Sequence, residues 1–151
     1  MMTFNYVLNK IKNPDDIKDI KASYEYANSK LSGVMRKNGD TEISHCLEVA
    51  NILIDLNVDK ETIICAILHS VLDFNDIDEK EIVENFSLET YKIIFSLSKI
   101  NNLEMVDDSE SAALYLRKVM VGLSEDVRVL FIKLADRLHN MRTFDAISTS
   151  R

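Results

Sequence analysis

Apolar residues near the end of the chain repeat with the period of an α-helix over residues 127–143. At 100° per residue, one stripe is formed by Val127, Leu130, Phe131, Leu134, Leu138 and Met141. Val129 and Ile132 lie on the opposite side, so the pattern predicts an interior helix that is apolar on two sides. Asp136 projects from this second side. We expect its carboxylate to point inward, where it needs a cation, a hydrogen-bond donor or a metal ion.

Similar patterns predict helices along the rest of the chain and no convincing strand. Asn13 and Pro14 begin the first helix, which we expect to run to about Leu31. The other helices are expected from a Ser44 cap to Leu56, from Asp59 onward, over residues 76–86, from a Ser87 cap to about Ile100, after Ser109 or Ser111, and from Ser124 onward. Residues 101–108 are predicted to form a long loop.

The composition favours one helical domain. The chain has 151 residues, of which 46% are apolar, enough to bury a single substantial core. Only three glycines and one proline are available for tight turns. The sequence therefore predicts an all-α, single-domain bundle of about seven helices over residues 1–151.

The sequence lacks the usual membrane and secretion signals. No apolar run approaches the roughly 18 residues that a membrane span needs, and the first residues lack a signal-peptide pattern. We therefore expect a cytoplasmic protein without a membrane partner. Cys46 and Cys65 lie in apolar helical patterns and are predicted to be reduced core thiols.

The charge of the chain bears on its partners. A net charge of −7 argues against binding to nucleic acid, which needs a basic surface. Residues 73–110 carry eleven acids and three bases, a net of −8, whereas residues 111–142 carry six bases and three acids, a net of +3. A small molecule that bears phosphates should therefore be attracted to the carboxy-terminal helices.

Two histidines stand in patterns that could place them in the interior. His45 begins an apolar helical stripe, and by this position alone it is a hydrogen-bonded core histidine or a ligand. His69 follows the continuous apolar run of residues 63–68 and lies one helical turn before Asp73. Both His69 and Asp73 could therefore face a common cavity.

Several charged residues allow either a structural or a functional interpretation. Arg36 and Lys37 precede an Asn-Gly-Asp turn signal, so they are either solvated surface cations or ligand contacts. Asp136 is either a metal ligand or the structural partner of a nearby base, Lys133 or Arg137. Spacing alone does not choose between these interpretations.

One sequence motif favours the functional interpretation. Residues 133–143 read K-L-A-D-R-L-H-N-M-R-T, which closely resembles the last signature of the RelA/SpoT hydrolase domain. That domain is a branch of the HD superfamily of metal-dependent phosphohydrolases. The resemblance extends over about residues 20–143 and includes the Arg-Lys turn and the His that follows it over residues 34–45. It implies the helical HD-domain fold.

The resemblance also implies roles for individual residues. The implied metal ligands are His45, His69 and Asp136. The implied contacts to a guanine nucleotide are Arg36, Lys37 and Asn140. Two imidazoles and a carboxylate suit manganese, iron or zinc, and Mn²⁺ is the cofactor that we expect. The implied ligand is ppGpp or pppGpp, from which the family removes the 3′-pyrophosphate.

The chain departs from the family where catalysis occurs. The family reads His-Asp-x-x-Glu-Asp, whereas residues 69–74 read His-Ser-Val-Leu-Asp-Phe. Ser70 replaces a ligating Asp, and Phe74 replaces a catalytic Asp. Asp73 occupies the position of the catalytic Glu with one methylene less, and it is our candidate catalytic residue. Nearby Asp76 is an alternative carboxylate.

These departures leave three hypotheses. We favour a nucleotide-binding, regulatory domain in which hydrolysis is weakened or lost. The alternative is an active Mn²⁺-dependent hydrolase that removes pyrophosphate from (p)ppGpp. The third is a helical scaffold whose histidines are core residues. By the resemblance, we expect the chain to lack the family's carboxy-terminal helices, and a longer native chain could carry a synthetase domain.

Overall fold

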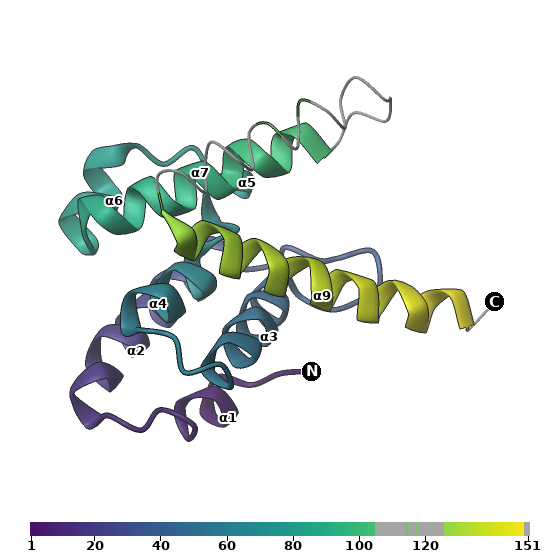
Figure 1. The fold of residues 1–151 in the computed structure, drawn as a ribbon, viewed down its shortest axis with the longest axis horizontal. Helices are drawn as coiled ribbons and strands as arrows, with labels where there is room; N and C mark the ends of the chain where they lie inside the picture. The colour runs from purple at the N-terminus through teal and green to yellow at the C-terminus, as the bar shows by residue number, and fades with distance from the viewer. Residues whose placement is uncertain (105–113, 115–116, 118–125, 150–151) are drawn as a thin grey trace.

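The computed structural model describes the backbone of residues 1–104, 114, 117 and 126–149 (Figure 1). The helices are α1 (Phe4–Leu8), α2 (Pro14–Lys30), α3 (Glu42–Ile54), α4 (Lys60–Leu68), α5 (Val71–Phe74), α6 (Glu79–Asn85), α7 (Leu88–Glu104) and α9 (Val127–Thr149). Within this part of the chain, the extended pairing is an isolated bridge between Met35 and Thr41. The prediction of an all-α fold is confirmed.

Several helix starts follow the capping residues in the sequence. The Asn13 side chain accepts a hydrogen bond from the backbone N–H of Asp15, and Pro14 occupies the first turn of α2. Asp59 caps α4, and the hydroxyl of Ser87 accepts from the N–H of Thr90 at the start of α7. These predicted starts are confirmed.

The predicted start of α3 is wrong. Thr41, not Ser44, is the N-cap, and its hydroxyl accepts a hydrogen bond from the N–H of Ser44 at 3.2 Å. The bridge between Met35 and Thr41 holds Thr41 extended just before the helix, which is the conformation that an N-cap needs. As a result, α3 begins at Glu42, and this acidic residue lies in its first turn.

The predicted boundaries of two further helices also differ from the structure. The acidic helix begins only at Glu79, because the Asp78 side chain caps it. α7 continues past Ile100 to Glu104, so the loop predicted from residue 101 is wrong for residues 101–104. Asn101 contacts two other elements with its side chain, which stabilises this extension. Residues 105–108 and the helix start predicted at Ser109 or Ser111 lie outside the described residues.

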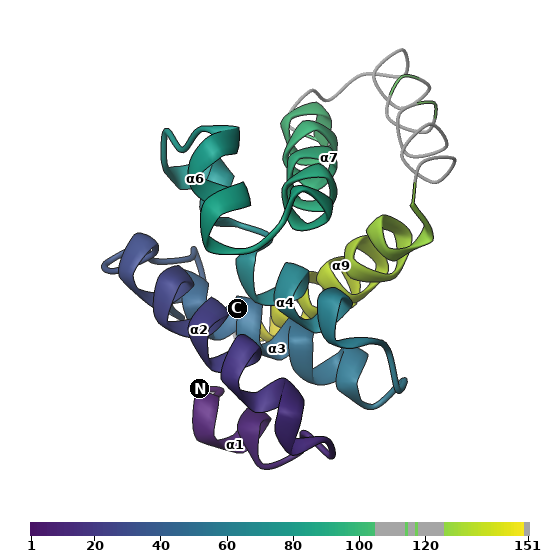
Figure 2. The ribbon, with the colours of Figure 1, turned by 90° about the vertical axis from the view of Figure 1, so that its left-hand side faces the viewer.

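The core forms where five of the described helices meet. α3 packs against α4 and α9, while α2 packs against the other side of α4 and α7 lies against α4 and α9 (Figures 1 and 2). Fully buried side chains of this core include Ile20, Leu53, Ile67, Leu68, Ile94, Leu97 and Ile132. Cys46 and Cys65 are both buried and free, as predicted.

α9 is not the interior helix that its pattern predicted. Val129, Ile132 and Ala135 are buried against α3, α4 and α7, and Asp136 shares this side. The longer apolar stripe is exposed instead, with Leu134 57% and Met141 64% accessible. One face of α9 packs onto the core, which leaves the other face open. No helix in the described part of the chain is both long and apolar enough to cross a membrane.

Candidate metal centre

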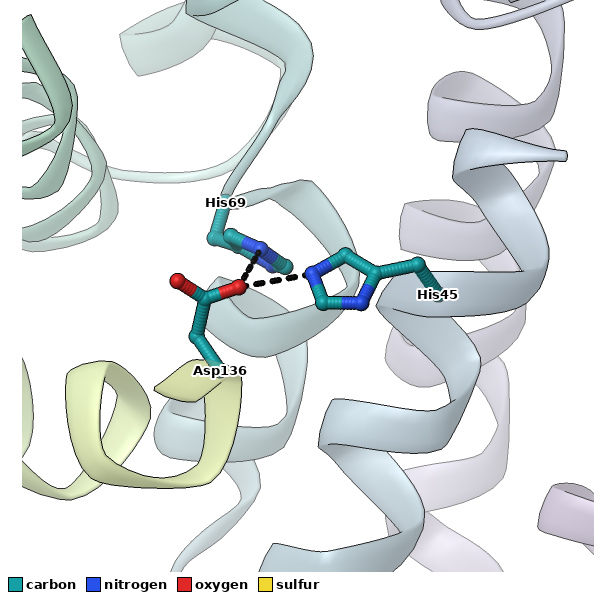
Figure 3. A group of neighbouring side chains, drawn as sticks. All are labelled: His45, His69 and Asp136. Atoms are coloured by element: carbon teal, nitrogen blue, oxygen red, sulfur yellow. Dashed lines mark hydrogen bonds and ion pairs between the residues drawn. The ribbon is translucent and has the colours of Figure 1, made fainter. Parts of the chain in front are cut away.

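Three residues that are distant in the sequence meet in the interior (Figure 3). His45 comes from the first turns of α3, His69 caps the end of α4, and Asp136 comes from the buried face of α9. Their ligand atoms all lie within 4.8 Å of one another, and all three residues are buried. The chain thus contains a candidate His-His-Asp metal site. The role of each residue as a ligand stays a prediction.

Both imidazoles face the same carboxylate oxygen. The Nε2 atom of His45 lies 2.7 Å from Oδ1 of Asp136, and the Nε2 atom of His69 lies 3.5 Å from it. The Nδ1–H of His69 donates to the backbone carbonyl of Ala66 at 2.6 Å. This bond fixes the orientation of the His69 ring, so that Nε2 points into the cluster.

Asp136 uses its two oxygens differently. Oδ1 faces the histidines, while Oδ2 accepts a hydrogen bond from the Lys133 ammonium at 3.1 Å. Lys133 also donates to the side-chain carbonyl of Asn101 at 2.8 Å. The structural interpretation of Asp136 and the ligand interpretation are therefore compatible, because each concerns one oxygen.

The electrostatics suit metal ligands in two of the three groups. Burial lowers the pKa of His45 to about 4, against the opposing hydrogen bond to Asp136, so this imidazole is neutral at pH 7. Burial alone would raise the pKa of Asp136, but its contacts with His45 and His69 outweigh burial and hold it well below the usual range. Burial opposes a charged His69, yet Cys46 and Asp136 raise the pKa of His69 well above its ordinary value.

A third histidine joins the cluster, and sequence reasoning missed it. The Nδ1 atom of His139 lies 2.6 Å from Nδ1 of His45, and His139 is 7% exposed. Asp136 and His139 therefore contact opposite nitrogens of the His45 ring, and the tautomer of His45 decides which of these nitrogens donates. The available signal was spacing, since His139 follows Asp136 by three residues and so shares its side of α9.

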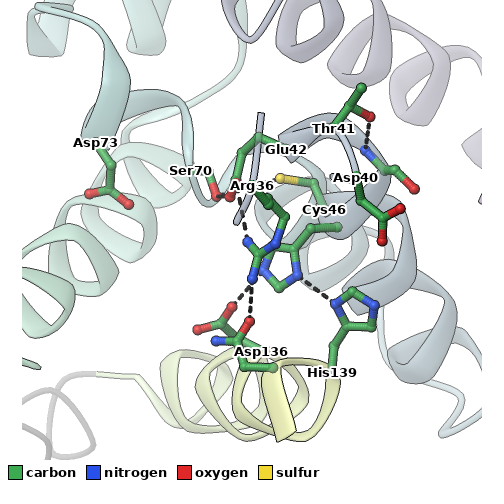
Figure 4. Close-up of polar contacts among 12 residues, drawn as sticks. Arg36, Asp40, Thr41, Glu42, Cys46, Ser70, Asp73, Asp136 and His139 are labelled. Atoms are coloured by element: carbon green, nitrogen blue, oxygen red, sulfur yellow. Dashed lines mark hydrogen bonds and ion pairs between the residues drawn. The ribbon is translucent and has the colours of Figure 1, made fainter. Parts of the chain in front are cut away.

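The three predicted nucleotide contacts line one pocket. Arg36, Lys37 and Asn140 surround a pocket of about 380 Å³, which Glu42 and Phe74 also line. The guanidinium of Arg36 donates to the Asn140 side-chain carbonyl at 2.5 Å and to Glu42 at 3.0 Å. Glu42 lies three residues before His45 on α3, and Asn140 lies four residues after Asp136 on α9, so these two bonds link the pocket to the helices that carry the cluster. The pocket is therefore adjacent to the His-His-Asp cluster (Figure 4).

The turn around α5 holds the residues at which the chain departs from the family motif. The buried hydroxyl of Ser70 donates to Glu42 at 2.8 Å. The Asp73 carboxylate accepts from Ser98 at 2.9 Å and Asn101 at 3.0 Å, and it is not one of the three clustered ligands. Burial raises the pKa of the Asp73 carboxyl, although the hydrogen bonds from Ser98 and Asn101 act in the opposite direction.

Phe74, next along the turn, is 51% exposed and lines the pocket with its ring. An apolar ring can neither transfer a proton nor bind a cation as a carboxylate does. Asp76, the alternative carboxylate, is exposed on the segment that follows α5.

Comparison with known proteins agrees with this architecture. A sequence model of the HD domain matches residues 23–151, and the chain therefore belongs to the HD domain family. Among its relatives are RelA/SpoT-type proteins, as the motif at residues 133–143 indicated.

The chain is 43% identical over 124 residues to the GTP pyrophosphokinase rsh of Brucella ovis, which covers 82% of this chain and 16% of the relative. It is 34% identical over 142 residues to the GTP pyrophosphokinase of Myxococcus xanthus, covering 91% of this chain and 19% of the relative. The bifunctional (p)ppGpp synthase/hydrolase SpoT of Escherichia coli (strain K12) is 33% identical over 133 residues, with coverage of 88% and 19%. The chain spans less than a fifth of the length of these relatives.

Proposed function

We propose that this chain is a metal-binding HD domain that binds ppGpp or pppGpp and in which hydrolysis is weakened or lost. Its role is then regulatory, as a domain that responds to the nucleotide. The observation that carries the proposal is the adjacency of the His-His-Asp cluster to the pocket of Arg36, Lys37 and Asn140.

The pocket has the chemistry that a guanine nucleotide with several phosphates needs. Arg36 and Lys37 provide a guanidinium and an ammonium, the usual partners of phosphate oxygens. The Asn140 amide carries both donors and an acceptor, which suits a polar base or sugar edge. A pocket of about 380 Å³ is within the range of small-molecule sites.

The clustered donors fit a divalent metal such as Mn²⁺. Two imidazole nitrogens and a carboxylate oxygen form a mixed set that first-row metals accept, and His45 is already neutral. When bound, such an ion supplies a Lewis acid and an activated water. The chain's own residues orient that set: Ala66 holds His69, His139 holds His45, and Lys133 holds Asp136.

Weak hydrolysis follows from the α5 turn. Ser70 offers a neutral hydroxyl beside the cluster, and Phe74 has no group that moves a proton. Asp73 is engaged by Ser98 and Asn101. A general acid or base provides a factor of about 10²–10⁴ in rate, so the loss of one such group leaves little turnover.

The alternative is an active Mn²⁺-dependent hydrolase that removes pyrophosphate from (p)ppGpp. Asp73 favours it, because a carboxylate remains at the position of the family's catalytic Glu, next in the chain to the pocket residue Phe74. The SpoT relative is itself a (p)ppGpp synthase/hydrolase. A synthetase domain in a longer native chain and a cytoplasmic location both remain predictions.

Two measurements test the proposal. In the first, ppGpp is titrated into the protein in a calorimeter, once with Mn²⁺ present and once with a chelator. The second is an assay of pyrophosphate release. We expect saturable binding of ppGpp and very slow release of pyrophosphate. Rapid release that requires Mn²⁺ would establish the alternative. Absence of ppGpp binding under both conditions would overturn both nucleotide hypotheses.

A further inference from the structure

A second buried carboxylate lies beside the His-His-Asp cluster. Glu42 is only 6% exposed and sits in the first turn of α3, three residues before His45. Residues three apart on a helix share one side, so Glu42 faces the same region as His45. Sequence reasoning did not single out Glu42, because the predicted Ser44 cap placed it outside the helix.

Glu42 contacts residues that neighbour His69 and Asp136. Its Oε1 accepts a hydrogen bond from Ser70 at 2.8 Å, and Ser70 directly follows His69. Its Oε2 pairs with Arg36 at 3.0 Å, and Arg36 also bonds to Asn140, one turn beyond Asp136 on α9. Figure 4 shows Glu42, Ser70 and Arg36 next to one another, on the same side as Asp136.

The buried position of the Glu42 carboxylate is costly and needs compensating contacts. Burial of a carboxylate is costly unless cations and donors satisfy it. Two ionised oxygens offer about four lone-pair sites, and the Ser70 hydroxyl and the Arg36 guanidinium occupy two of them. Capacity therefore remains to accept a metal ion or its bound water. In addition, Mn²⁺ favours oxygen ligands, whereas the cluster itself contains one carboxylate.

Glu42 is not one of the three clustered ligands, and we propose that it is the second carboxylate of the metal site, acting through a water bound to the metal ion. Ser70, in the turn after α4, is neutral where the family has an Asp. Glu42 supplies a negative charge in this region from α3 instead. This inference rests on the proposed metal site. The competing role is a purely structural one, in which Glu42 only neutralises Arg36.

Titration of the metal-stripped protein with Mn²⁺ alone, followed by the electron paramagnetic resonance signal of free Mn²⁺, separates these roles. Glu42→Gln keeps the shape of the side chain and removes its charge. We expect it to weaken Mn²⁺ binding by about tenfold or more, in line with the roughly 10–100-fold that loss of a supporting group costs a metal site. The matched control is Glu48→Gln, which removes the same charge from the same helix.

Glu48 acts on His139 through its charge and so tests for a merely long-range electrostatic effect. We expect this control to bind Mn²⁺ within about twofold of the wild type, as for a charge that is largely screened. In addition, Ser70→Asp in the Glu42→Gln background should restore most of the affinity, because it returns a carboxylate to the same place from the neighbouring element.

The outcomes distinguish this inference from the function on which it rests. If the wild type binds Mn²⁺ and Glu42→Gln binds it equally well, the metal site stands and the role of Glu42 is overturned. If the wild type binds no Mn²⁺, the metal part of the proposed function fails and this inference fails with it. Circular dichroism checks the fold. Should Glu42→Gln not fold, Glu42→Asp takes its place, since it keeps the charge but withdraws it by one methylene, and undiminished affinity would again overturn the role.

Discussion

The buried cluster and the α5 turn lie side by side, yet they differ in what they retain. In the cluster, His45, His69 and Asp136 converge within 4.8 Å, and a second group orients each of them. In the turn, Phe74 presents an exposed ring, and Asp73 is engaged by two amide or hydroxyl donors of α7. Under the proposed function, the cluster holds a metal ion, whereas the turn lacks part of the carboxylate set that hydrolysis needs.

Under the proposed function, metal binding and catalysis therefore depend on separate elements of the domain. The cluster draws its residues from α3, the end of α4 and α9, which pack together as the core. Asp73, the candidate catalytic residue, lies on α5, which packs against α7 and α2 and contributes no residue to the cluster. Substitutions in α5 can therefore alter chemistry without dismantling the cluster. Four variants test this separation.

The largest effect is expected from Asp136→Asn. It removes the carboxylate that both imidazoles face, so Mn²⁺ affinity should fall by at least about a hundredfold, beyond the usual cost of losing an outer-shell partner. Isothermal titration with Mn²⁺ measures the change. Asp126→Asn, just before the same helix, is the matched control and should bind Mn²⁺ as the wild type does. Equal affinity in the two variants would contradict the role of Asp136.

The next effect is a gain of activity. Ser70→Asp combined with Phe74→Asp returns two carboxylates to the turn, and pyrophosphate release from ppGpp with Mn²⁺ should rise by about a hundredfold, within the range of general acid-base catalysis. Phe74→Asn with Ser70→Asn has nearly the same size but no charge and serves as the control. Unchanged release in the carboxylate variant would mean that the α5 turn does not limit hydrolysis.

A smaller loss is expected on the nucleotide side of the pocket. Arg36→Ala removes a charged donor that contributes about 1.5–3 kcal/mol per hydrogen bond, which corresponds to a loss of about tenfold or more in ppGpp affinity. Lys80→Ala, an exposed cation paired with Glu84, is the control for charge. If both variants bind ppGpp equally, Arg36 is a surface cation and the pocket is not the nucleotide site.

The smallest effect is expected from Asp73→Asn. The amide fills the same space, and Asp73 is not among the clustered ligands, so affinities for Mn²⁺ and ppGpp should stay within about twofold, as for most substitutions outside a site. Any residual pyrophosphate release should fall. A large loss of Mn²⁺ binding in this variant would show that Asp73 also supports the metal site, so that the cluster and the α5 turn are not separate in function.

The sequence predicted the identity of the clustered residues better than their surroundings. The motif at residues 133–143 indicated Asp136, and the resemblance to the RelA/SpoT hydrolase domain indicated His45 and His69. Periodicity could not show that these three side chains meet, because helix packing between α3, α4 and α9 brings them together. His139 was missed although its spacing from Asp136 was a signal, and Glu42 was missed because the predicted Ser44 cap placed it outside α3.

The predicted burial of α9 on two sides was the largest error, whereas the inward position of Asp136 was right. The helix has apolar residues on both sides, and periodicity does not show that one of these sides stays exposed. The structure buries the shorter side with Ile132 and leaves Leu134 on the exposed side. The cap at α3 shows a related limit. Thr41 and Ser44 both have the chemistry of an N-cap, and the bridge to Met35 decides between them.

The central claim is that His45, His69 and Asp136 bind one metal ion. Pulsed electron paramagnetic resonance of the Mn²⁺-loaded protein tests it most directly, because histidine nitrogens bound to Mn²⁺ modulate the electron spin echo. We predict nitrogen modulation in the wild type that is reduced in His45→Gln and in His69→Gln. An echo that carries water protons alone, with no nitrogen modulation at saturating Mn²⁺, would contradict the claim.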